Sequence, residues 1–333
     1  MCIVHNIFRK SVFIGLLLLS SLVFSQSTQD LKEYIKSNIT RYPSGENIRN
    51  YAIFTDDILQ LHLRVFTGKE VSVNQIQSNI KYNWIENLVF YASKGDGGIV
   101  GNIYYGLYEF DESMFMLHYL REEDIFLDIG ANVGHYSLLA SGIKNCQSIS
   151  IEPVPNTFER LNQQVNLNKL EKKISTLNIG LGNKCSKLNF SIDKNTMNRI
   201  VDSKYKNSVQ IPVKTVDILC DKIDVSLMKI DVEGYEKFVL EGSKTSLQNK
   251  NLKAVIIEIN FSNKFYGIEN EEVSEILIKN NFKPYKYNPL NRQLTELKSY
   301  NKEQFNTIFI RDLNFVENRL IESNKIKIWN KRI

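Results

Sequence analysis

The sequence predicts an α/β protein built on a parallel, doubly wound sheet of the Rossmann-like kind. From residue 124 onward, short apolar runs that suit buried strands alternate with amphipathic segments that suit helices. The first run, IFLDI at 125–129, enters a turn with two glycines, and a helical pattern, HYSLLAS at 135–141, follows at once. Because ligands of doubly wound sheets bind beyond the carboxyl ends of the strands, this turn is the first candidate site.

The other elements of the predicted sheet follow in the same alternation. Further strands are expected at 148–152, 174–181, 226–232 and 254–259, and helices over 156–169, 235–248 and 271–281. Asn156 or Thr157 is available to cap the first of these helices. The segment 186–218 alternates apolar and polar residues and predicts an inserted hairpin. The segments 283–289 and 306–311 would close the sheet, with Pro284 and Pro289 indicating an edge location.

The first hundred residues give weaker signals. Residues 12–24 are almost wholly apolar and follow Arg9 and Lys10, which predicts a signal-like or anchor segment over 1–25. Such a segment suggests a secretory or membrane-associated protein that contacts a membrane, or a cytoplasmic one if the leader is not used. A partly helical extension is expected over 26–110, with strand-like alternation at 99–110 and a helix at 113–120. The main domain would then span 111–315, with a tail at 316–333.

Charge and cysteine content exclude several classes of protein. The net charge of +5 comes from Lys and Arg residues spread along the chain without blocks, so no nucleic-acid partner is expected. The cysteines are Cys2, Cys146, Cys185 and Cys220, and they form neither a CxxC motif nor a cluster with His. The sequence therefore predicts no metal site and no disulfide framework.

The glycine turn has the residues of a nucleotide or cofactor site. Gly130 would let the backbone approach a ligand without a Cβ, and Gly134 would open the following helix. Asp128 precedes the turn, and Glu152 ends the next strand 22 residues after Gly130. This is about the spacing at which an acidic side chain binds a ribose diol. A tight corner that holds no ligand is the alternative.

The spacing of the glycines separates two kinds of ligand. A dinucleotide fingerprint needs G-x-G-x-x-G, but Asn132 replaces the middle glycine and His135 the last one. A pyrophosphate would lose its close backbone approach, whereas S-adenosylmethionine, a sulfonium cation without phosphates, tolerates the change. The carboxylates also suit a cation.

A second acidic motif, MKIDVEGYE at 228–236, follows a later strand. Asp231 and Glu233 would face the same crevice as the glycine turn and could orient or deprotonate an acceptor hydroxyl. Helix capping is the other interpretation, because carboxylates in a first turn satisfy free N–H groups. For Glu236 the capping interpretation is preferred.

Three motifs in order, DIGANVGHYS, IEPVPNTFERLNQQVNLN and LMKIDVEGYEKFVLEGS, resemble the FkbM family of S-adenosylmethionine-dependent methyltransferases. The resemblance covers roughly residues 100–312. It implies a class I methyltransferase fold, a seven-stranded sheet with an antiparallel last strand, and O-methylation of hydroxyl groups.

The resemblance also implies roles for individual residues. The methionine side of the cofactor would be lined by Asp128, Gly130, Asn132 and Gly134, and Glu152 would hold the ribose. Near the acceptor, Asp231 is the first candidate for the base and Glu233 the second, although the proton could also leave to water. Two further residues have competing interpretations. His135 would either contact the cofactor or acceptor or simply pack in the core. Asn183 would either contact the adenine or form a turn.

The expected function is therefore an S-adenosylmethionine-dependent O-methyltransferase acting on a hydroxyl of a sugar, glycan or secondary metabolite. Two alternatives remain. The leader is compatible with a secreted or surface-associated protein that kept the fold and lost activity. An NAD-dependent oxidoreductase is disfavoured by the missing third glycine.

Overall fold

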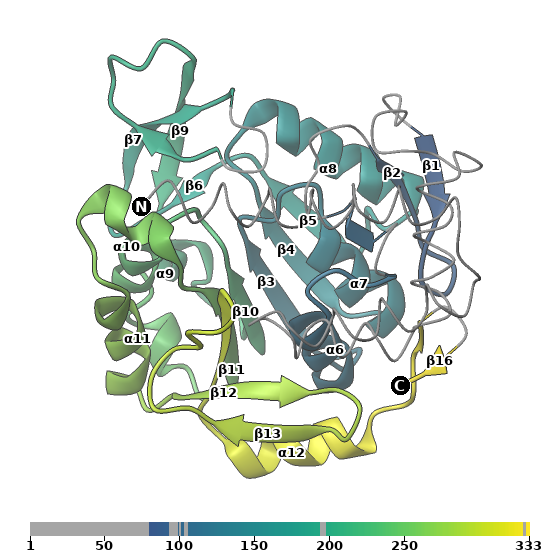
Figure 1. Ribbon diagram of the computed structural model, residues 1–333. Helices are drawn as coiled ribbons and strands as arrows, with labels where there is room; N and C mark the ends of the chain where they lie inside the picture. The colour runs from purple at the N-terminus through teal and green to yellow at the C-terminus, as the bar shows by residue number, and fades with distance from the viewer. Residues whose placement is uncertain (1–79, 93–98, 100, 103–105, 194–197, 329–330) are drawn as a thin grey trace, which may run out of the picture. The chain divides into compact units, whose positions relative to one another are not determined.

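The computed structural model describes residues 80–92, 99, 101–102, 106–193, 198–328 and 331–333 (Figure 1). All of these residues belong to one compact unit, Gln77–Ile333. The expected leader at 1–25 and most of the expected extension at 26–110 lie outside the described residues. The domain limits given above therefore stay predictions. In the described ranges, no helix is both long enough and apolar enough to cross a membrane.

The core of the fold is an eight-stranded sheet in the order β13-β12-β14-β11-β10-β3-β4-β5 (Figure 1). Its strands are β3 (Ile125–Ile129), β4 (Gln147–Ile151), β5 (Ile174–Leu177), β10 (Leu227–Ile230), β11 (Ala254–Glu258), β12 (Lys283–Asn288), β13 (Gln293–Glu296) and β14 (Asn306–Ile310). The five neighbouring strands β5, β4, β3, β10 and β11 run parallel to one another. Strand β14 is antiparallel to both β11 and β12. The α/β doubly wound prediction is confirmed, and β13 adds an eighth strand to the expected seven.

The strand order places the switch point of the sheet between β3 and β10. From β3 the chain moves outward through β4 to β5, and it then returns to the other side of β3 as β10. The paired residues Ile129 and Ile230 end these two strands side by side. A crevice for a ligand is expected at this carboxyl edge.

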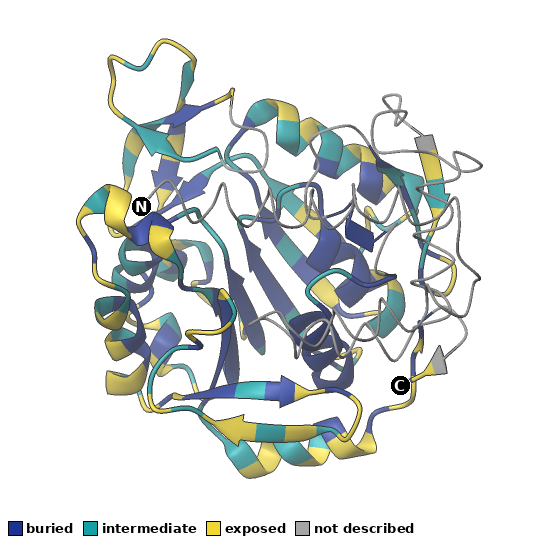
Figure 2. Cartoon of the chain, viewed as in Figure 1, coloured by how far each residue is buried: buried dark blue, intermediate teal, exposed yellow. Residues whose placement is uncertain are grey.

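Helices cover both faces of the sheet. They are α6 (Phe110–Tyr119), α7 (His135–Lys144), α8 (Pro155–Leu167), α9 (Val216–Leu219), α10 (Glu236–Glu241), α11 (Asn270–Lys279) and α12 (Leu313–Glu322), with 3₁₀ turns η3 (Ser246–Gln248) and η4 (Phe261–Tyr266). Residues of α9, α10 and α11 pack with β3, β10 and β11 in one apolar cluster, and these central strands are almost wholly buried (Figure 2). On α7, Ser137 bonds Ser150 and Ser141 bonds Ser148, at 2.6 and 2.8 Å between hydroxyl oxygens. These small side chains let α7 lie close to β4.

A hairpin of β1 (Ile80–Asn83) and β2 (Val89–Ala92) is attached to α8 by side-chain amides. Gln164 accepts the backbone N–H of Tyr91 at 2.8 Å and donates to its carbonyl at 2.6 Å. One helical turn later, Asn168 does the same for Val89, at 2.9 and 2.8 Å. The two amides thus bond the edge of β2 as a neighbouring strand would.

A four-stranded sheet inserted after β5 has the order β6-β9-β7-β8. Its strands are β6 (Gly180–Leu181), β7 (Ser186–Ser191), β8 (Ile200–Val201) and β9 (Ser208–Lys214). The antiparallel pair of β7 and β9 confirms the hairpin expected in 186–218. The single strand expected over 174–181 is wrong, because Asn178 donates to the carbonyls of Glu152 and Pro153 and the chain leaves the main sheet there.

Three further expectations need correction. The strand-like alternation at 99–110 does not give a strand in its described residues: Ile99, Gly101 and Asn102 are helical, and 106–109 are bends. The Asn102 side chain closes this loop by accepting the N–H of Tyr108 at 2.7 Å.

The other two concern capping and strand order. The helix at 156–169 has no side-chain cap, because Val154 is its N-cap and Pro155 occupies the first turn, where no N–H is needed. The edge location inferred from Pro284 is wrong, since β12 lies between β13 and β14.

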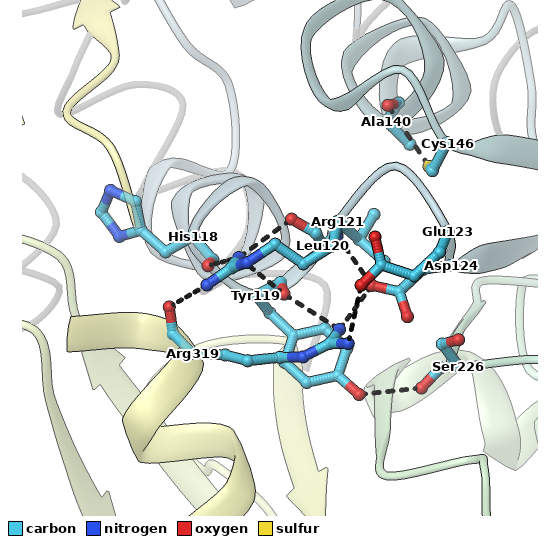
Figure 3. Close-up of polar contacts among 10 residues, drawn as sticks. All are labelled: His118, Tyr119, Leu120, Arg121, Glu123, Asp124, Ala140, Cys146, Ser226 and Arg319. Atoms are coloured by element: carbon cyan, nitrogen blue, oxygen red, sulfur yellow. Dashed lines mark hydrogen bonds and ion pairs between the residues drawn. The ribbon is translucent and has the colours of Figure 1, made fainter. Parts of the chain in front are cut away.

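At the opposite, amino edge of the sheet, arginines attach α12 to α6 and to the start of β3 (Figure 3). Arg319 on α12 pairs with Asp124, and both side chains are largely buried. Arg121 donates to the last carbonyls of α6, among them His118 at 2.8 Å, and to the carbonyl of Arg319 at 2.6 Å. The last strands, β15 (Lys327–Ile328) and β16 (Lys331–Arg332), form a short antiparallel pair.

Candidate active site

The glycine turn after β3 is bound to the ends of both neighbouring strands. The N–H groups of Gly130 and Ala131 donate to the carbonyl of Ile151 at 3.0 and 2.9 Å. Gly130 has φ +83°, and a Cβ on it would lie 1.8 Å from the carbonyl oxygen of Asp231. The turn therefore requires glycine here, because its backbone packs directly on the second predicted motif.

The turn also holds Glu152 in place. Asn132 has φ +51°, a conformation that asparagine tolerates, and its N–H donates to Glu152 Oε2 at 3.1 Å. The N–H of Val154 donates to Glu152 Oε1 at 2.9 Å. Burial raises the pKa of Glu152 to about 7, although both backbone hydrogen bonds oppose this. Each carboxyl oxygen has a further acceptor position, so the side chain is oriented and can still bind a diol.

Asp128 and Gly134 lie on either side of the turn. Asp128 is buried in β3 and accepts the hydroxyl of Ser137 at 2.5 Å, which ties the strand to α7. Burial raises the pKa of Asp128 to about 6. Gly134 is the N-cap of α7 with φ +95°, and a Cβ there would come within 2.7 Å of Leu161. Both residues thus fix the turn against the helices that pack on it.

His135 has protein partners at both ring nitrogens. Asn102 Nδ2 donates to His135 Nδ1 at 3.0 Å, because the Asn102 carbonyl oxygen already accepts the N–H of Tyr108. His135 Nε2 must then carry the proton and donate to Ser113 Oγ at 2.9 Å, and that hydroxyl donates onward to the Tyr108 carbonyl. Burial lowers the pKa of His135 to about 3. These contacts favour packing of His135 over a cofactor or acceptor contact, which stays a prediction.

Asn183 lies apart from the glycine turn in its contacts. Its side chain is exposed and donates to Glu241 Oε2 at 3.0 Å, at the far end of α10. Its backbone is packed close to Gly242, where a Cβ would meet the Asn183 Cα at 3.3 Å. These contacts favour the turn interpretation of Asn183, in which it joins the inserted sheet to α10, and the adenine contact stays a prediction.

Asp231 of the second motif forms an ion pair with Lys229, a residue that was not predicted as part of the site. Lys229, 1% exposed within β10, donates to Asp231 Oδ2 and to Asn306 Oδ1, both at 3.1 Å. Burial alone would lower the pKa of Lys229, but nearby carboxylates, with Asp231 foremost, raise it above its ordinary value. The Asp231 side chain is 31% exposed, so an ion pair with one buried and one accessible member lies at the carboxyl edge of the sheet.

Glu233 and Glu236 differ in their surroundings. Glu236 Oε1 accepts the N–H groups of Val232 and Gly234 at 3.0 and 3.2 Å, so its side chain stabilises the turn that precedes α10 and does not cap the helix as expected. Glu233 has φ +55°, and burial, followed by the charge of Asp231, raises its pKa to about 8. At neutral pH, Glu233 is therefore mainly protonated.

More polar groups surround the Lys229 ammonium than the sequence indicated. Its nitrogen lies 5.3 Å from the ring centroid of Tyr136, whose hydroxyl donates to Glu109 Oε2 at 2.6 Å. Glu258 ends β11, and burial raises its pKa well above its ordinary value, with the charge of Asp231 adding to the effect. Lys229 had a signal in the sequence, as a lone charge in an apolar strand. Glu109, Tyr136 and Asn306 had none, because only the fold brings them here.

The arrangement fits a ligand that is cationic and free of phosphate. Seven of the nine predicted residues gather at the switch point: Asp128, Gly130, Asn132, Gly134, Glu152, Asp231 and Glu233. The side chains among them that ionise are all carboxyl groups, and Lys229, the cation of the cluster, is already paired. Within the described part of the chain, no group of three or more His, Cys, Asp or Glu side chains could hold a metal ion.

Comparison with known proteins agrees with this geometry. Residues 128–284 match the sequence model of the methyltransferase FkbM domain. The hexuronic acid methyltransferase AglP of Haloferax volcanii is 29% identical over 154 residues, which are 45% of this chain and 62% of AglP. The chain thus spans about three fifths of the length of this curated relative.

Solved structures give distant matches. The precorrin-6y C5,15-methyltransferase of Geobacter metallireducens GS-15 is 10% identical, with 60% of this chain and 83% of that chain covered and a TM-score of 0.34. The M. jannaschii TYW2 in complex with AdoMet is 13% identical, with 71% and 88% covered and a TM-score of 0.36. From the sequence match and the two motifs joined at the switch point, residues 128–284 of this chain are a methyltransferase FkbM domain.

Proposed function

We propose that this protein is an S-adenosylmethionine-dependent O-methyltransferase that acts on a hydroxyl group of a sugar or glycan. One observation carries the proposal: the turn that orients Glu152 rests, through Gly130, on the backbone of Asp231. A diol-binding carboxylate and an accessible, ion-paired carboxylate therefore border the same crevice. The AglP relative, named for a hexuronic acid, supports a sugar as the acceptor.

The cofactor side of the proposal rests on Glu152 and on the acidic character of the turn. When bound, S-adenosylmethionine would supply an electrophilic methyl group beside a positive sulfur. Glu152 would accept hydrogen bonds from the ribose diol, and Asp128 and Asp231 would add negative potential that favours the cation. The described residues of the turn offer no Lys or Arg that would favour a pyrophosphate.

On the acceptor side, Asp231 is a better base than Glu233. The Asp231 side chain is 31% exposed and is held by the Lys229 ammonium, whereas the pKa of about 8 leaves Glu233 mainly protonated at pH 7. Asp231 would accept the proton of the acceptor hydroxyl and align its oxygen for an in-line displacement. Lys229 would hold the carboxylate in position without touching the acceptor.

Two substitutions test these roles. Asp231→Asn should bind S-adenosylhomocysteine within about threefold of wild type, as measured by calorimetry, while kcat on a panel of sugar acceptors falls by about 10²–10⁴. Lys229→Met should retain cofactor binding and move the acidic limb of the pH–kcat profile to higher pH, a change that a loss of folding alone would not cause. Lys187→Met removes an exposed charge on the inserted sheet and is the control. It should change neither the affinity for S-adenosylhomocysteine nor the pH–kcat profile.

The outcomes separate the competing functions. Binding of NADH without binding of S-adenosylhomocysteine would replace the proposal by an oxidoreductase. Cofactor binding without turnover on any acceptor would favour the inactive alternative. Full turnover by Asp231→Asn would remove Asp231 from the mechanism and leave Glu233 or water as the base.

A further inference from the structure

Three exposed phenylalanines lie at the carboxyl edge of the sheet, beside the candidate acceptor side. Phe261 and Phe265 belong to η4, which follows β11, and Phe305 directly precedes β14; the three are 52%, 54% and 57% exposed. The N–H of Ile259 donates to the Phe305 carbonyl at 2.8 Å, so the two stretches are neighbours. The rings of Phe261 and Phe305 lie 6.3 Å apart in an edge-on arrangement. We call Phe261, Phe265 and Phe305 the aromatic rim.

Arg199 of the inserted sheet extends over this rim. Its guanidinium carbon lies 3.9 Å from the ring centroid of Phe265. The hydroxyl of Tyr266 donates to the carbonyl of Ile200 at 3.1 Å, which holds the inserted sheet and η4 together. Among the residues that the structure describes, the guanidinium has no hydrogen-bond or ion-pair partner. Stacking thus positions the group while its N–H donors stay available.

The rim is joined to the motif that carries Asp231. A Cβ on Gly234 would lie 2.3 Å from the carbonyl oxygen of Ser262, so η4 rests directly on the IDVEG turn. The charge of Arg199 also opposes the rise in the pKa of Glu233, as expected for a cation beside that turn. The rim and Arg199 therefore border the side of the crevice on which an acceptor would approach Asp231.

We propose that Arg199 and the aromatic rim form an acceptor subsite for a glycan that carries an anionic group, a carboxylate or a phosphate. This inference rests on the proposed function and names its substrate class. The rings offer apolar surface to the C–H faces of sugar rings, and exposed apolar patches of this kind mark binding sites. The guanidinium fork matches the two oxygens of a carboxylate or phosphate.

Charge complementarity selects an anion over a neutral sugar. The Asp231 carboxyl lies on the inner side, where it would repel an anionic group. Arg199, whose guanidinium has no ion-pair partner in the described part of the chain, lies at the outer border, so the acceptor would place its anion there and direct a hydroxyl inward to Asp231. A neutral acceptor would leave the donors of Arg199 to water.

The test compares three sugars on the full chain saturated with S-adenosylhomocysteine. Dissociation constants are measured by saturation-transfer NMR titration for methyl β-glucuronide, glucose 6-phosphate and methyl β-glucoside. Wild type should bind at least one of the two anionic sugars about tenfold more tightly than the neutral one. The tighter of the two anions identifies a carboxylate or a phosphate as the recognised group.

Substitutions assign the preference to the subsite. Arg199→Gln should lose the anion preference and keep its affinity for methyl β-glucoside, while Arg199→Lys retains part of the preference. Phe265→Ala should weaken binding of all three sugars. The matched controls are Lys187→Gln, which removes a charge from the same inserted sheet, and Ile321→Ala, which removes a 67% exposed apolar residue on α12.

Equal affinity for charged and neutral sugars, or the same effect from Arg199→Gln and Lys187→Gln, would overturn the inference. So would rim variants that abolish binding to anionic lipid vesicles and leave sugar binding unchanged, since the rim would then be a membrane contact. Failure to bind S-adenosylhomocysteine would instead reject the proposed function. Cofactor binding without an anion preference rejects the subsite alone.

Discussion

At Gly130, the backbone of the glycine turn packs against the backbone of the acidic motif. A Cβ on this residue would lie 1.8 Å from the carbonyl oxygen of Asp231. Glycines in such turns are usually explained by the approach of a ligand. Here the approach of the protein's own strand already requires glycine, and a ligand bound as proposed would rest on both motifs. The same residue thus sets the distance between the cofactor side and Asp231.

We therefore expect Gly130→Ala to damage both stability and binding. The left-handed backbone costs about 1–2 kcal/mol for alanine, and the contact with Asp231 forces the two motifs apart in addition. The free energy of unfolding in urea should fall by clearly more than 2 kcal/mol, and calorimetry should show a loss of S-adenosylhomocysteine affinity of about tenfold or more.

Gly267 provides a matched control for this prediction. It has φ +68°, but a Cβ on it would meet no atom within 4 Å. Gly267→Ala should therefore cost only the backbone term of about 1–2 kcal/mol and leave cofactor affinity unchanged. Equal losses for the two substitutions would show that the contact with Asp231 adds nothing.

The residues of the site were predictable where the signal is local. Gly130, Glu152 and Asp231 follow buried strands, and a parallel sheet brings such strand ends together without further information. Lys229 needed the fold, because a lysine within an apolar strand shows only that a partner must exist. Arg199 needed it as well, since a loop arginine in an inserted sheet has no periodic or motif signal.

At the scale of elements, periodicity identified the strands and helices of the main sheet and failed where a side chain redirects the backbone. The run 174–181 has a continuous strand pattern, yet Asn178 turns the chain into a second sheet. Residues 99–102 alternate like a strand, yet the described ones are helical and Asn102 closes the loop. Such side-chain-to-backbone bonds compete with regular structure and leave little trace in hydrophobic patterning.

The attachment of α12 depends on an ion pair with unusually little exposure. Side-chain exposure is 16% for Arg319 and 6% for Asp124. The Arg319 guanidinium also lies 4.7 Å from the ring centroid of Phe315 and 5.2 Å from that of Tyr119. Removal of the arginine would leave a buried carboxylate with the Arg121 N–H, at 2.7 Å, as a remaining partner.

Arg319→Met should therefore lower the free energy of unfolding by about 2–4 kcal/mol, as measured by urea titration. Lys279→Met is the control, because the Lys279–Glu275 pair on α11 is exposed at 74% and 58% and should contribute about 0.5 kcal/mol or less. A similar small loss for both substitutions would mean that burial adds nothing to the Arg319 pair.

At the scale of the whole molecule, burial of carboxyl groups dominates the electrostatics of the described unit. Burial raises the pKa of Asp128 to about 6, of Glu152 and Glu236 to about 7, and of Glu112 and Glu233 to about 8. A sheet edge that concentrates acidic side chains around one lysine tolerates them by keeping several protonated. A cationic cofactor would favour their ionised forms, which links cofactor binding to proton release.

This pattern predicts that the ligand-free protein loses stability as the pH rises from 6.5 to 8. In the unfolded chain these glutamates titrate near 4.5, so above that pH the folded state binds more protons and the free energy of unfolding falls with pH. His118 and His135, with pKa values lowered from 6.5 to about 4 and 3, act in the opposite direction, and their effect fades out within about one pH unit above 6.5.

Thermal and urea unfolding between pH 6.5 and 8 should show a fall on the order of 1–3 kcal/mol, and the Glu112→Gln variant isolates one contributor. Glu112 is buried in α6 and is not among the residues assigned to binding, and glutamine has the shape of its protonated form. Glu112→Gln should therefore flatten the pH dependence and be more stable than wild type at pH 8, with little difference at pH 6.5. A variant with the same slope as wild type would mean that Glu112 ionises without cost, and that burial in α6 does not raise its pKa.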